Sequence, residues 1–392
     1  MKNVITDLDH LGRGIIRDNK ITFIPKTIPG DLVEYQIKKE NKNYNEGRLD
    51  KIIEKSINHI DALCPYYNTC GGCNISNLSY QDQLEYKKNK VANIFKKYSN
   101  IDIDKEILPS EKEYHYRNKI TYHNDNNLGL VSIDNDIINT NECLLVSNKI
   151  NALFNKIKKD NTSEVKEITI REVDNGLILK IKGHMNIDPY INDAIEIYEN
   201  DKLIYQKERP YIIINNIKYI ITGNSFFQIN TSNIEKLYNT IIEKGNFSKE
   251  ENVVDLYCGV GSITLYVSKY VKSIMGIEIV PDAIENAKEN ARINNITNAK
   301  FLCGDVSKLI NEFIIADTII VDPPRSGLDK HTIDVLNKLN LKKIVYVSCD
   351  PMTLSRDINL LTKYKFKNIT MVDMFPQTYH VESVVVLERI DE

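Results

Sequence analysis

The sequence predicts an α/β fold in the C-terminal half of the chain, from about residue 216. Four apolar runs there fit buried strands: 252–256, 273–279, 316–321 and 342–348. Amphipathic stretches that fit helices follow them: 262–270, 281–294, 328–339 and 351–362. Strand–helix alternation of this kind is typical of a mainly parallel sheet with helices on both faces. A final strand pair is expected at 368–373 and 383–389.

Two smaller parts are expected before this sheet. Residues 1–56 contain short strand patterns separated by glycine and proline, and their length fits a five-stranded, OB-like β-barrel. Residues 57–215 are more irregular, with short strands and a helix expected over 79–97, which suggests a small α+β domain. We therefore divide the chain into 1–56, 57–215 and 216–392.

Composition indicates an ordinary globular protein. The chain has 392 residues, 42% of them hydrophobic, and a net charge of -3, so overall charge does not indicate a nucleic-acid partner. It has no apolar stretch of about 18 residues that could cross a membrane. Its first residues lack the apolar region of a signal peptide. We expect a cytoplasmic protein.

The cysteines fall into two groups. Their number, seven, is odd, and a cytoplasmic chain is not expected to form disulfides. The first half contains Cys64, Cys70, Cys73 and Cys143. Four thiolates suit either zinc or an iron–sulfur cluster, and the C-x5-C-x2-C spacing is unusual for a zinc ribbon. The residues alone therefore predict metal binding and leave the metal open.

A nucleotide-type ligand site is expected where the first strands of the sheet end. The strand 253–256 runs into a turn with Gly259 and Gly261, where the backbone can approach a ligand closely. Glu278 ends the next strand and could accept hydrogen bonds from a ribose, and Asp305 after the third could reach an adenine edge. The full dinucleotide fingerprint is missing, which favours S-adenosylmethionine over NAD.

Two other strands bring reactive groups to the same edge. Asp322 starts an Asp-Pro-Pro-Arg-Ser-Gly loop, in which Arg325 replaces the aromatic residue of amino-group methyltransferases. Cys349 ends the strand before Pro351, which begins the next helix. A position near a helix N-terminus lowers a thiol pKa and favours the thiolate, which makes Cys349 a candidate nucleophile; taken alone, a buried, inert cysteine fits this position as well.

Glu382 would supply the base that such a nucleophile requires, with His380 as its rival. Uracil C5 is a poor nucleophile until a thiolate adds to C6 and creates an enolate. The enolate can take a methyl group, and a base must then remove the C5 proton. The target base has to be flipped out or single-stranded.

Five segments of the C-terminal half resemble, in the same order, segments of the RNA 5-methyluridine methyltransferases of the RumA/TrmA family. The matching segments are Ser225–Asn230 (Ser-Phe-Phe-Gln-Ile-Asn), the Gly259/Gly261 turn, Asp322–Gly327, Ser348–Pro351 and His380–Glu382. The resemblance implies a Rossmann-like class I methyltransferase domain with Cys349 as nucleophile and Glu382 as base. It also implies cofactor contacts at Gln228, Tyr257, Ser262, Glu278, Asp305 and Asp322.

The N-terminal half resembles a subgroup of that family. Residues 1–56 resemble a TRAM domain, a small RNA-binding barrel, through Leu11–Gly14 and the Pro29-Gly30-Asp31 turn. Cys64, Cys70, Cys73 and Cys143 resemble the [4Fe-4S] site of the ribosomal-RNA enzymes, and the tRNA-modifying members lack both features. The resemblance implies 23S rRNA as substrate, with no DNA or membrane partner, and a monomer. It also suggests that the helix after Cys73 packs on the catalytic domain, and that Tyr116–Lys119 contacts RNA phosphates.

Three alternatives remain. The first is a metal-stabilised RNA-binding protein with an inactive methyltransferase fold, against which the retention of Cys349 and Glu382 speaks. The second is a tRNA uridine C5 methyltransferase. The third is a cytosine C5 methyltransferase, which would need a protonating carboxylic acid near N3 and typically places its cysteine after a proline on a different loop.

Overall fold

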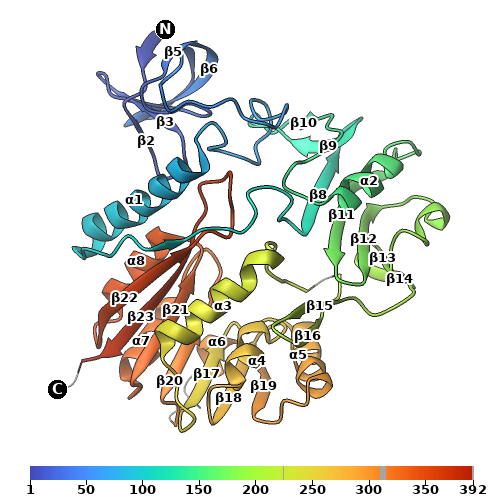
Figure 1. The fold of residues 1–392 in the computed structure, drawn as a ribbon, viewed down its shortest axis with the longest axis vertical. Helices are drawn as coiled ribbons and strands as arrows, with labels where there is room; N and C mark the ends of the chain where they lie inside the picture. Colours follow the sequence, from blue (N-terminus) through green and yellow to red (C-terminus); the bar gives the residue numbers. More distant parts are fainter. Residues whose placement is uncertain (224, 310–314, 391–392) are drawn as a thin grey trace.

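Three packed parts make up the chain, and Figure 1 shows the N-terminal one at the opposite end of the molecule from the large C-terminal sheet. The structure is a computed structural model and describes residues 1–223, 225–309 and 315–390. Among these residues, no helix is both long and apolar enough to cross a membrane.

The N-terminal part is a six-stranded sheet with the order β1-β5-β6-β4-β3-β2. Its strands are β1 (Lys2–Val4), β2 (Asp7–Leu8), β3 (Gly14–Ile16), β4 (Ile21–Ile24), β5 (Leu32–Glu40) and β6 (Tyr44–Glu54). A small apolar core with Ile16, Ile24 and Val33 holds it together. The sequence suggested five strands; the sixth arises because the two-residue β2 pairs with β3.

The middle part is a seven-stranded sheet with the order β10-β9-β8-β11-β12-β13-β14. Its elements are β8 (Lys119–Asn124), β9 (Leu128–Val131), β10 (Ile137–Ile138), α2 (Asn148–Ile157), β11 (Val165–Val173), β12 (Gly176–Gly183), the 3-10 turn η1 (Asp188–Tyr190), β13 (Glu196–Glu199) and β14 (Lys202–Gln206). Helix α2 packs on this sheet, where the ring of Phe154 stacks on Tyr122 with centroids 3.5 Å apart. The hairpin of β15 (Tyr211–Ile214) and β16 (Ile217–Ile220) leads into the C-terminal part.

The C-terminal part is an eight-stranded mixed sheet with the order β19-β18-β17-β20-β21-β23-β22-β7. Its strands are β17 (Asn252–Leu256), β18 (Ser273–Glu278), β19 (Ala299–Cys303), β20 (Thr318–Val321), β21 (Lys343–Ser348), β22 (Tyr364–Val372), β23 (Glu382–Arg389) and, from the middle segment, β7 (Ile107–Leu108). Its helices are α3 (Thr231–Gly245), α4 (Ser262–Ser268), α5 (Pro281–Ile293), α6 (Val306–Leu309), α7 (Lys330–Lys338) and α8 (Pro351–Leu360).

Helices cover both faces of this sheet, as the sequence predicted. Successive strand residues point to opposite faces, so Val253 packs in one apolar core while Val254 lies in the other. Five strands, β19 to β21 in the sheet order, are parallel. Strand β23 is antiparallel to both β21 and β22. The carboxyl ends of the parallel strands therefore share one edge with the start of β23.

Helix α1 (Tyr80–Ser99) crosses from the N-terminal part to this sheet (Figure 1). It begins where the Ser79 hydroxyl accepts a hydrogen bond from the Asp82 N–H, and it ends at Asn100 in the left-handed conformation. Val91 and Phe95 are fully buried in the same apolar core as Leu354 of α8. The helix predicted over 79–97 agrees with α1 to within two residues at each end. Its apolar face belongs to the core of the C-terminal sheet.

Candidate active site

The register between β21 and β23 brings Cys349 and Glu382 together. Ser348, the last residue of β21, is paired with Ser383 of β23. Cys349 is the first residue beyond this pairing on β21 and Glu382 is the corresponding residue on β23, so the register directs the two towards each other. The charge of Glu382 accordingly acts on the Cys349 thiol. Glu382 is buried, and Cys349 is half-buried.

The loop after β20 adds two charges at the same place. Strand β20 is paired in parallel with β21, with Val321 beside Tyr346, so Asp322 follows at the edge that carries Cys349. The charge of Asp322 raises the pKa of both Cys349 and Glu382, and the guanidinium of Arg325 lowers both. The four groups therefore interact electrostatically, and Arg325 is the cation that opposes the carboxylates.

The expectation of a lowered thiol pKa at Cys349 is wrong for the free protein. Burial raises the pKa of this thiol to about 12, and the charges of Glu382 and Asp322 add to the effect. The start of helix α8 cannot offset this, because the Asp350 carboxylate already accepts hydrogen bonds from the N–H groups of Met352 and Thr353. Proximity to a helix N-terminus does not favour a thiolate when another anion caps it.

The carboxyl groups of Glu382 and Asp322 also have pKa values above their ordinary range. Burial raises the pKa of Glu382 to about 8, and the nearby Asp322 contributes in the same direction. Burial raises the pKa of Asp322 to about 7. Titration this close to neutral pH suits a group that must exchange protons during catalysis.

His380 is a poorer candidate for the base. Burial and the charge of Arg325 lower the pKa of His380 to about 3. Its Nε2 lies 3.3 Å from Nη2 of Arg325, and its ring packs 4.1 Å from that of Tyr379, centroid to centroid. The imidazole is therefore a weakly basic, neutral group held against Arg325, which leaves Glu382 as the better base.

The turn after β17 has the open backbone that the sequence predicted. Gly259 and Gly261 have φ values of 56° and 78°. A Cβ at Gly259 would meet no described atom within 4 Å, so the conformation requires glycine while the space beside it stays free. Tyr257 also has a positive φ, 66°, which a non-glycine residue adopts at a cost of about 1–3 kcal/mol. Such strain is common at ligand sites.

Glu278 and Asp305 lie along the same sheet edge. Glu278 is paired with Cys303 at the ends of β18 and β19, and Asp305 follows two residues later. The Glu278 carboxylate accepts hydrogen bonds from the N–H groups of Gly259 (3.2 Å) and Val280 (2.9 Å), which fix its orientation. Asp305 accepts from the N–H and hydroxyl of Ser307 at the start of α6.

The remaining expected cofactor residues lie on two separate elements. Ser262 begins α4, directly after the glycine turn, and its carbonyl accepts a hydrogen bond from the Tyr219 hydroxyl. Gln228 lies in the segment before α3, where its carbonyl accepts from Asn118 of the middle part. The Asn118 N–H also donates to the carbonyl of Ile229. The middle part thus holds the segment that carries Gln228.

Asp255 was not singled out from the sequence. It is fully buried in β17, and one carboxylate oxygen accepts a hydrogen bond from the Thr264 hydroxyl at 2.5 Å. Its other oxygen has no hydrogen-bond partner among the described residues. Burial raises the pKa of Asp255 to about 7. A carboxylate inside an otherwise apolar strand, Val-Val-Asp-Leu, was the signal that could have drawn attention to it.

Cys64, Cys70, Cys73 and Cys143 line one cavity of about 620 Å³ between the N-terminal and middle parts. The ammonium of Lys26 enters this region from the N-terminal sheet and donates hydrogen bonds to the carbonyls of Cys70 and Cys73. Among the residues that the structure describes, however, no group of three or more His, Cys, Asp or Glu is arranged to hold a metal ion. The four cysteines thus share a cavity, but among the described residues they are not arranged as a metal site.

Comparison with known proteins gives consistent results. Residues 200–390 match the model of the tRNA (uracil-5-)-methyltransferase family. An uncharacterized RNA methyltransferase of Clostridium tetani (strain Massachusetts / E88) is 34% identical and matches across 98% of this chain and 95% of its own. The chain belongs to the RNA 5-methyluridine methyltransferases of the RumA/TrmA family.

Other members of this family show similar coverage. An uncharacterized RNA methyltransferase of Staphylococcus aureus (strain COL) is 33% identical across 97% of this chain and 96% of its own. The crystal structure of Pyrococcus abyssi tRNA (uracil-54, C5)-methyltransferase in complex with S-adenosyl-L-homocysteine is 26% identical, with a TM-score of 0.82. That match covers 99% of this chain and 100% of the other. The enzyme is thus an S-adenosylmethionine-dependent RNA methyltransferase with a mixed α/β fold.

The raised pKa of Glu382 predicts how this residue affects stability. Its folded-state pKa of about 8 lies above the ordinary 4.5, so folding takes up a proton between these values, and this residue's contribution to stability falls as pH rises through that window. Glu382→Gln should therefore stabilise the protein by roughly 1–3 kcal/mol more at pH 9 than at pH 5. Denaturation midpoints measured at both pH values test this.

The exposed Glu285, on α5, provides the matched control. Glu285→Gln should change the midpoint equally little at both pH values. A Glu382→Gln variant with the same midpoint difference from wild type at pH 5 and pH 9 would contradict the assigned environment of the carboxyl group.

Proposed function

We propose that the enzyme methylates C5 of a uridine in RNA, with Cys349 as nucleophile and Glu382 as the base that removes the C5 proton. The observation that carries this proposal is the pairing of Ser348 with Ser383, which brings the thiol and the carboxyl group together at the carboxyl edge of the sheet. Retention of both groups in one buried site also argues against an inactive RNA-binding protein.

The reaction begins with addition of the Cys349 sulfur to C6 of the uracil ring. The S–C6 bond forms, the C5–C6 double bond opens, and the ring carries an enolate. Because burial holds the pKa of the thiol near 12, its proton has to leave as this bond forms. The proton passes to solvent water, which reaches the half-buried Cys349, so that Glu382 stays ionised for the last step. Arg325, whose charge lowers the pKa of Cys349 and Glu382, stabilises the anionic forms that the step requires.

S-adenosylmethionine, when bound, supplies the electrophilic methyl group that C5 of the enolate takes. C5 then carries both the new methyl group and its original hydrogen. Glu382 removes that hydrogen as a proton, the C5–C6 double bond re-forms, and Cys349 leaves C6 as the thiolate. The carboxylate form of Glu382 performs this step, so the residue has to be ionised at that stage.

Residues at the adjacent sheet edge fit the methyl donor. We assign the Glu278 carboxylate to the ribose hydroxyls and Asp305 to the adenine edge, because both follow strands beside the open Gly259 turn. Gln228, Tyr257, Ser262 and Asp322 complete the proposed contacts, together with the backbone at Gly261. The donor has a sulfonium cation, and a cation beside the buried carboxyl groups of Asp322 and Asp255, whose pKa values lie near 7, would favour their ionised forms.

For the RNA we propose 23S rRNA, with a cytoplasmic monomer as the acting form. The support is the resemblance of the N-terminal sheet to a TRAM domain and of the four cysteines to the cluster site of rRNA-modifying enzymes. A tRNA is the second candidate, because the Pyrococcus abyssi relative is named a tRNA (uracil-54, C5)-methyltransferase and matches 99% of this chain. The presence of the N-terminal part alone therefore does not separate the two substrates.

The substrate proposal is tested with RNA from a strain in which the gene is deleted. Purified enzyme with S-adenosylmethionine should form 5-methyluridine in 23S rRNA but not in tRNA, as nuclease digestion and mass spectrometry would show. Cys349→Ala should reduce the rate by at least about a thousandfold, the scale of loss when a covalent nucleophile is removed.

If only tRNA is methylated, tRNA would replace 23S rRNA as the substrate, and the proposed chemistry would still stand. A Cys349→Ala variant that methylates uridine at the wild-type rate, or a product in which cytosine C5 carries the methyl group, would refute the mechanism.

We also propose that Cys64, Cys70, Cys73 and Cys143 hold a [4Fe-4S] cluster. All four line one cavity of about 620 Å³. The choice of a cluster over zinc is supported by the resemblance of the four cysteines to the cluster site of the ribosomal-RNA enzymes, and by a C-x5-C-x2-C spacing that is unusual for a zinc ribbon. The proposed chemistry needs no electron transfer, so the group would have a structural role.

Metal analysis of anaerobically purified protein tests the cluster. Wild-type protein should contain about four iron and four sulfide ions per chain, and Cys73→Ser should lose most of both. Cys303→Ser is the matched control, since Cys303 is exposed on β19 and lies outside the cavity. Stoichiometric zinc without iron, or equal iron content in both variants, would contradict the proposal.

A further inference from the structure

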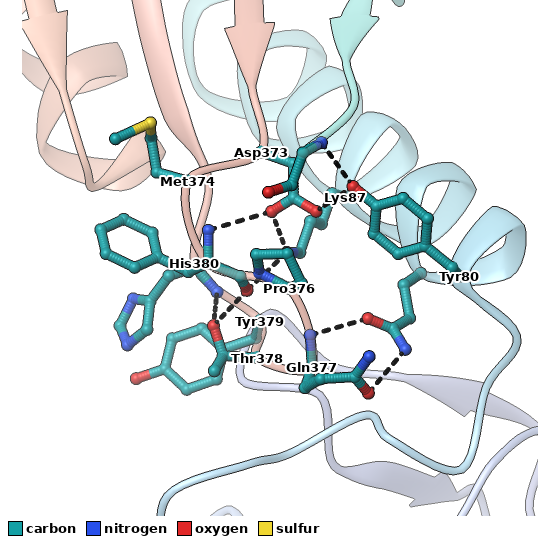
Figure 2. Close-up of polar contacts among 12 residues, drawn as sticks. Tyr80, Lys87, Asp373, Met374, Pro376, Gln377, Thr378, Tyr379 and His380 are labelled. Carbon is teal, nitrogen blue, oxygen red and sulfur yellow. Dashed lines mark hydrogen bonds and ion pairs between the residues drawn. The ribbon is translucent and has the colours of Figure 1, made fainter. Parts of the chain in front are cut away.

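The segment that joins β22 to β23 is largely buried, unlike an ordinary surface loop. We call residues Asp373–Val381 the strap; Figure 2 shows its contacts with α1. The strap ends directly before Glu382, so its conformation sets where that side chain begins. Loops normally run over the surface, because buried backbone polar groups need partners. Here the partners come mostly from parts of the chain far away in sequence.

A buried ion pair fixes the start of the strap. Nζ of Lys87, on α1, lies 2.6 Å from Oδ1 of Asp373, and both side chains are completely buried. The same ammonium donates to the carbonyl of Phe375 at 2.9 Å, and the Tyr80 hydroxyl donates to Asp373 at 3.0 Å. A buried charge without its partner is costly, so this pair restricts the strap to the position in which the charges meet.

A second anchor holds the middle of the strap in a strained conformation. Gln377 is buried and has a φ of 70°, which costs about 1–3 kcal/mol for a residue with a side chain. Its N–H donates to Oε1 of Gln83 at 2.8 Å, and Nε2 of Gln83 donates back to its side-chain oxygen at 3.1 Å. Its carbonyl accepts from the N–H groups of Asn74 and Ile75, directly after Cys73.

Two further contacts fix the strap on either side of Gln377. The Tyr116 hydroxyl, from the middle part, donates to the carbonyl of Pro376 at 3.0 Å. Nζ of Lys90, one turn after Lys87 on α1, donates to the carbonyl of Tyr379 at 2.8 Å. Residues outside 216–392 therefore contact the strap at several positions between Asp373 and Tyr379. Tyr379 lies three residues before Glu382, the proposed base.

We propose that Lys87 and Gln83 are positioning residues for proton abstraction. They act through the strap: α1 holds the strap, and the strap places Glu382 beside the uracil C5 hydrogen. Neither residue touches the reacting atoms. This inference rests on the proposed function, because it assigns a consequence to the placement of Glu382 that follows only if Glu382 is the base.

The proposed chemistry supplies a readout that a purely structural role would not change. Cys349 addition and methyl transfer both precede proton removal. If Glu382 is displaced, the RNA should still be methylated but should stay bonded to Cys349. A misplacement of about 1 Å can slow a step by about a hundredfold. An enzyme–RNA adduct that survives denaturing electrophoresis should then accumulate.

The experiment compares full-length variants with S-adenosylmethionine and the RNA substrate. Lys87→Met should retain RNA affinity and accumulate at least about ten times more denaturation-resistant adduct than wild type. Glu382→Gln, which removes the base itself, is the positive control. Lys88→Met is the matched control on the same helix, because Lys88 pairs with Glu85 and, among the described residues, forms no hydrogen bond or ion pair with the strap. It should behave like wild type.

Lys87→Met leaves Asp373 buried without its cation and can fail to fold. In that case Gln83→Met, which removes only uncharged hydrogen bonds (those with Gln377 and one to the Leu78 carbonyl), provides the decisive measurement and should show the same adduct. A folded variant of either kind that turns over without adduct, or equal adduct in Lys88→Met, would overturn the positioning role. Absence of adduct in Glu382→Gln would instead refute the proposed base.

Discussion

In the antiparallel pair β21–β23, Ser348 lies opposite Ser383, and this register directs the side chains of Cys349, which follows Ser348, and Glu382, which precedes Ser383, towards each other. A slip of β23 by one residue would turn every one of its side chains to the other face of the sheet and separate the two groups. Val384 packs in the apolar core on one face of the sheet, and Val385 and Leu387 pack in the core on the other, so β23 is held from both sides. Packing of the sheet thus determines the geometry of the site.

Burial at this edge makes the chemistry possible and also costs stability. Glu382, Asp322 and Asp255 are carboxyl groups whose pKa values burial raises to about 8, 7 and 7. The free protein therefore holds protons on these groups near neutral pH, and Glu382 has to lose its proton before it can act as the base. The positive φ of Tyr257 adds local strain beside them. Contacts elsewhere, including the apolar core that α1 shares with the sheet, compensate for these costs.

The sequence was a good guide to strands and strand ends and a poor one to long-range contacts. Apolar runs such as 252–256 located the parallel strands, and the carboxyl-edge rule then placed Asp322 beside Cys349. Strand β7 was missed because two residues carry no periodicity. The Lys87–Asp373 pair joins positions 286 residues apart, which no local pattern reveals. The thiol pKa was misjudged because spacing shows neither burial nor the Asp350 cap at the helix start.

The central claim is that Cys349 forms a covalent bond with the target base. RNA in which uridine is replaced by 5-fluorouridine tests it directly, because a fluorine at C5 leaves no proton for Glu382 to remove and the bond to sulfur then persists. After incubation with S-adenosylmethionine, digestion and mass spectrometry should find methylated fluorouridine attached to the peptide that contains Cys349. No adduct, or an adduct that still forms with Cys349→Ala, would contradict the account.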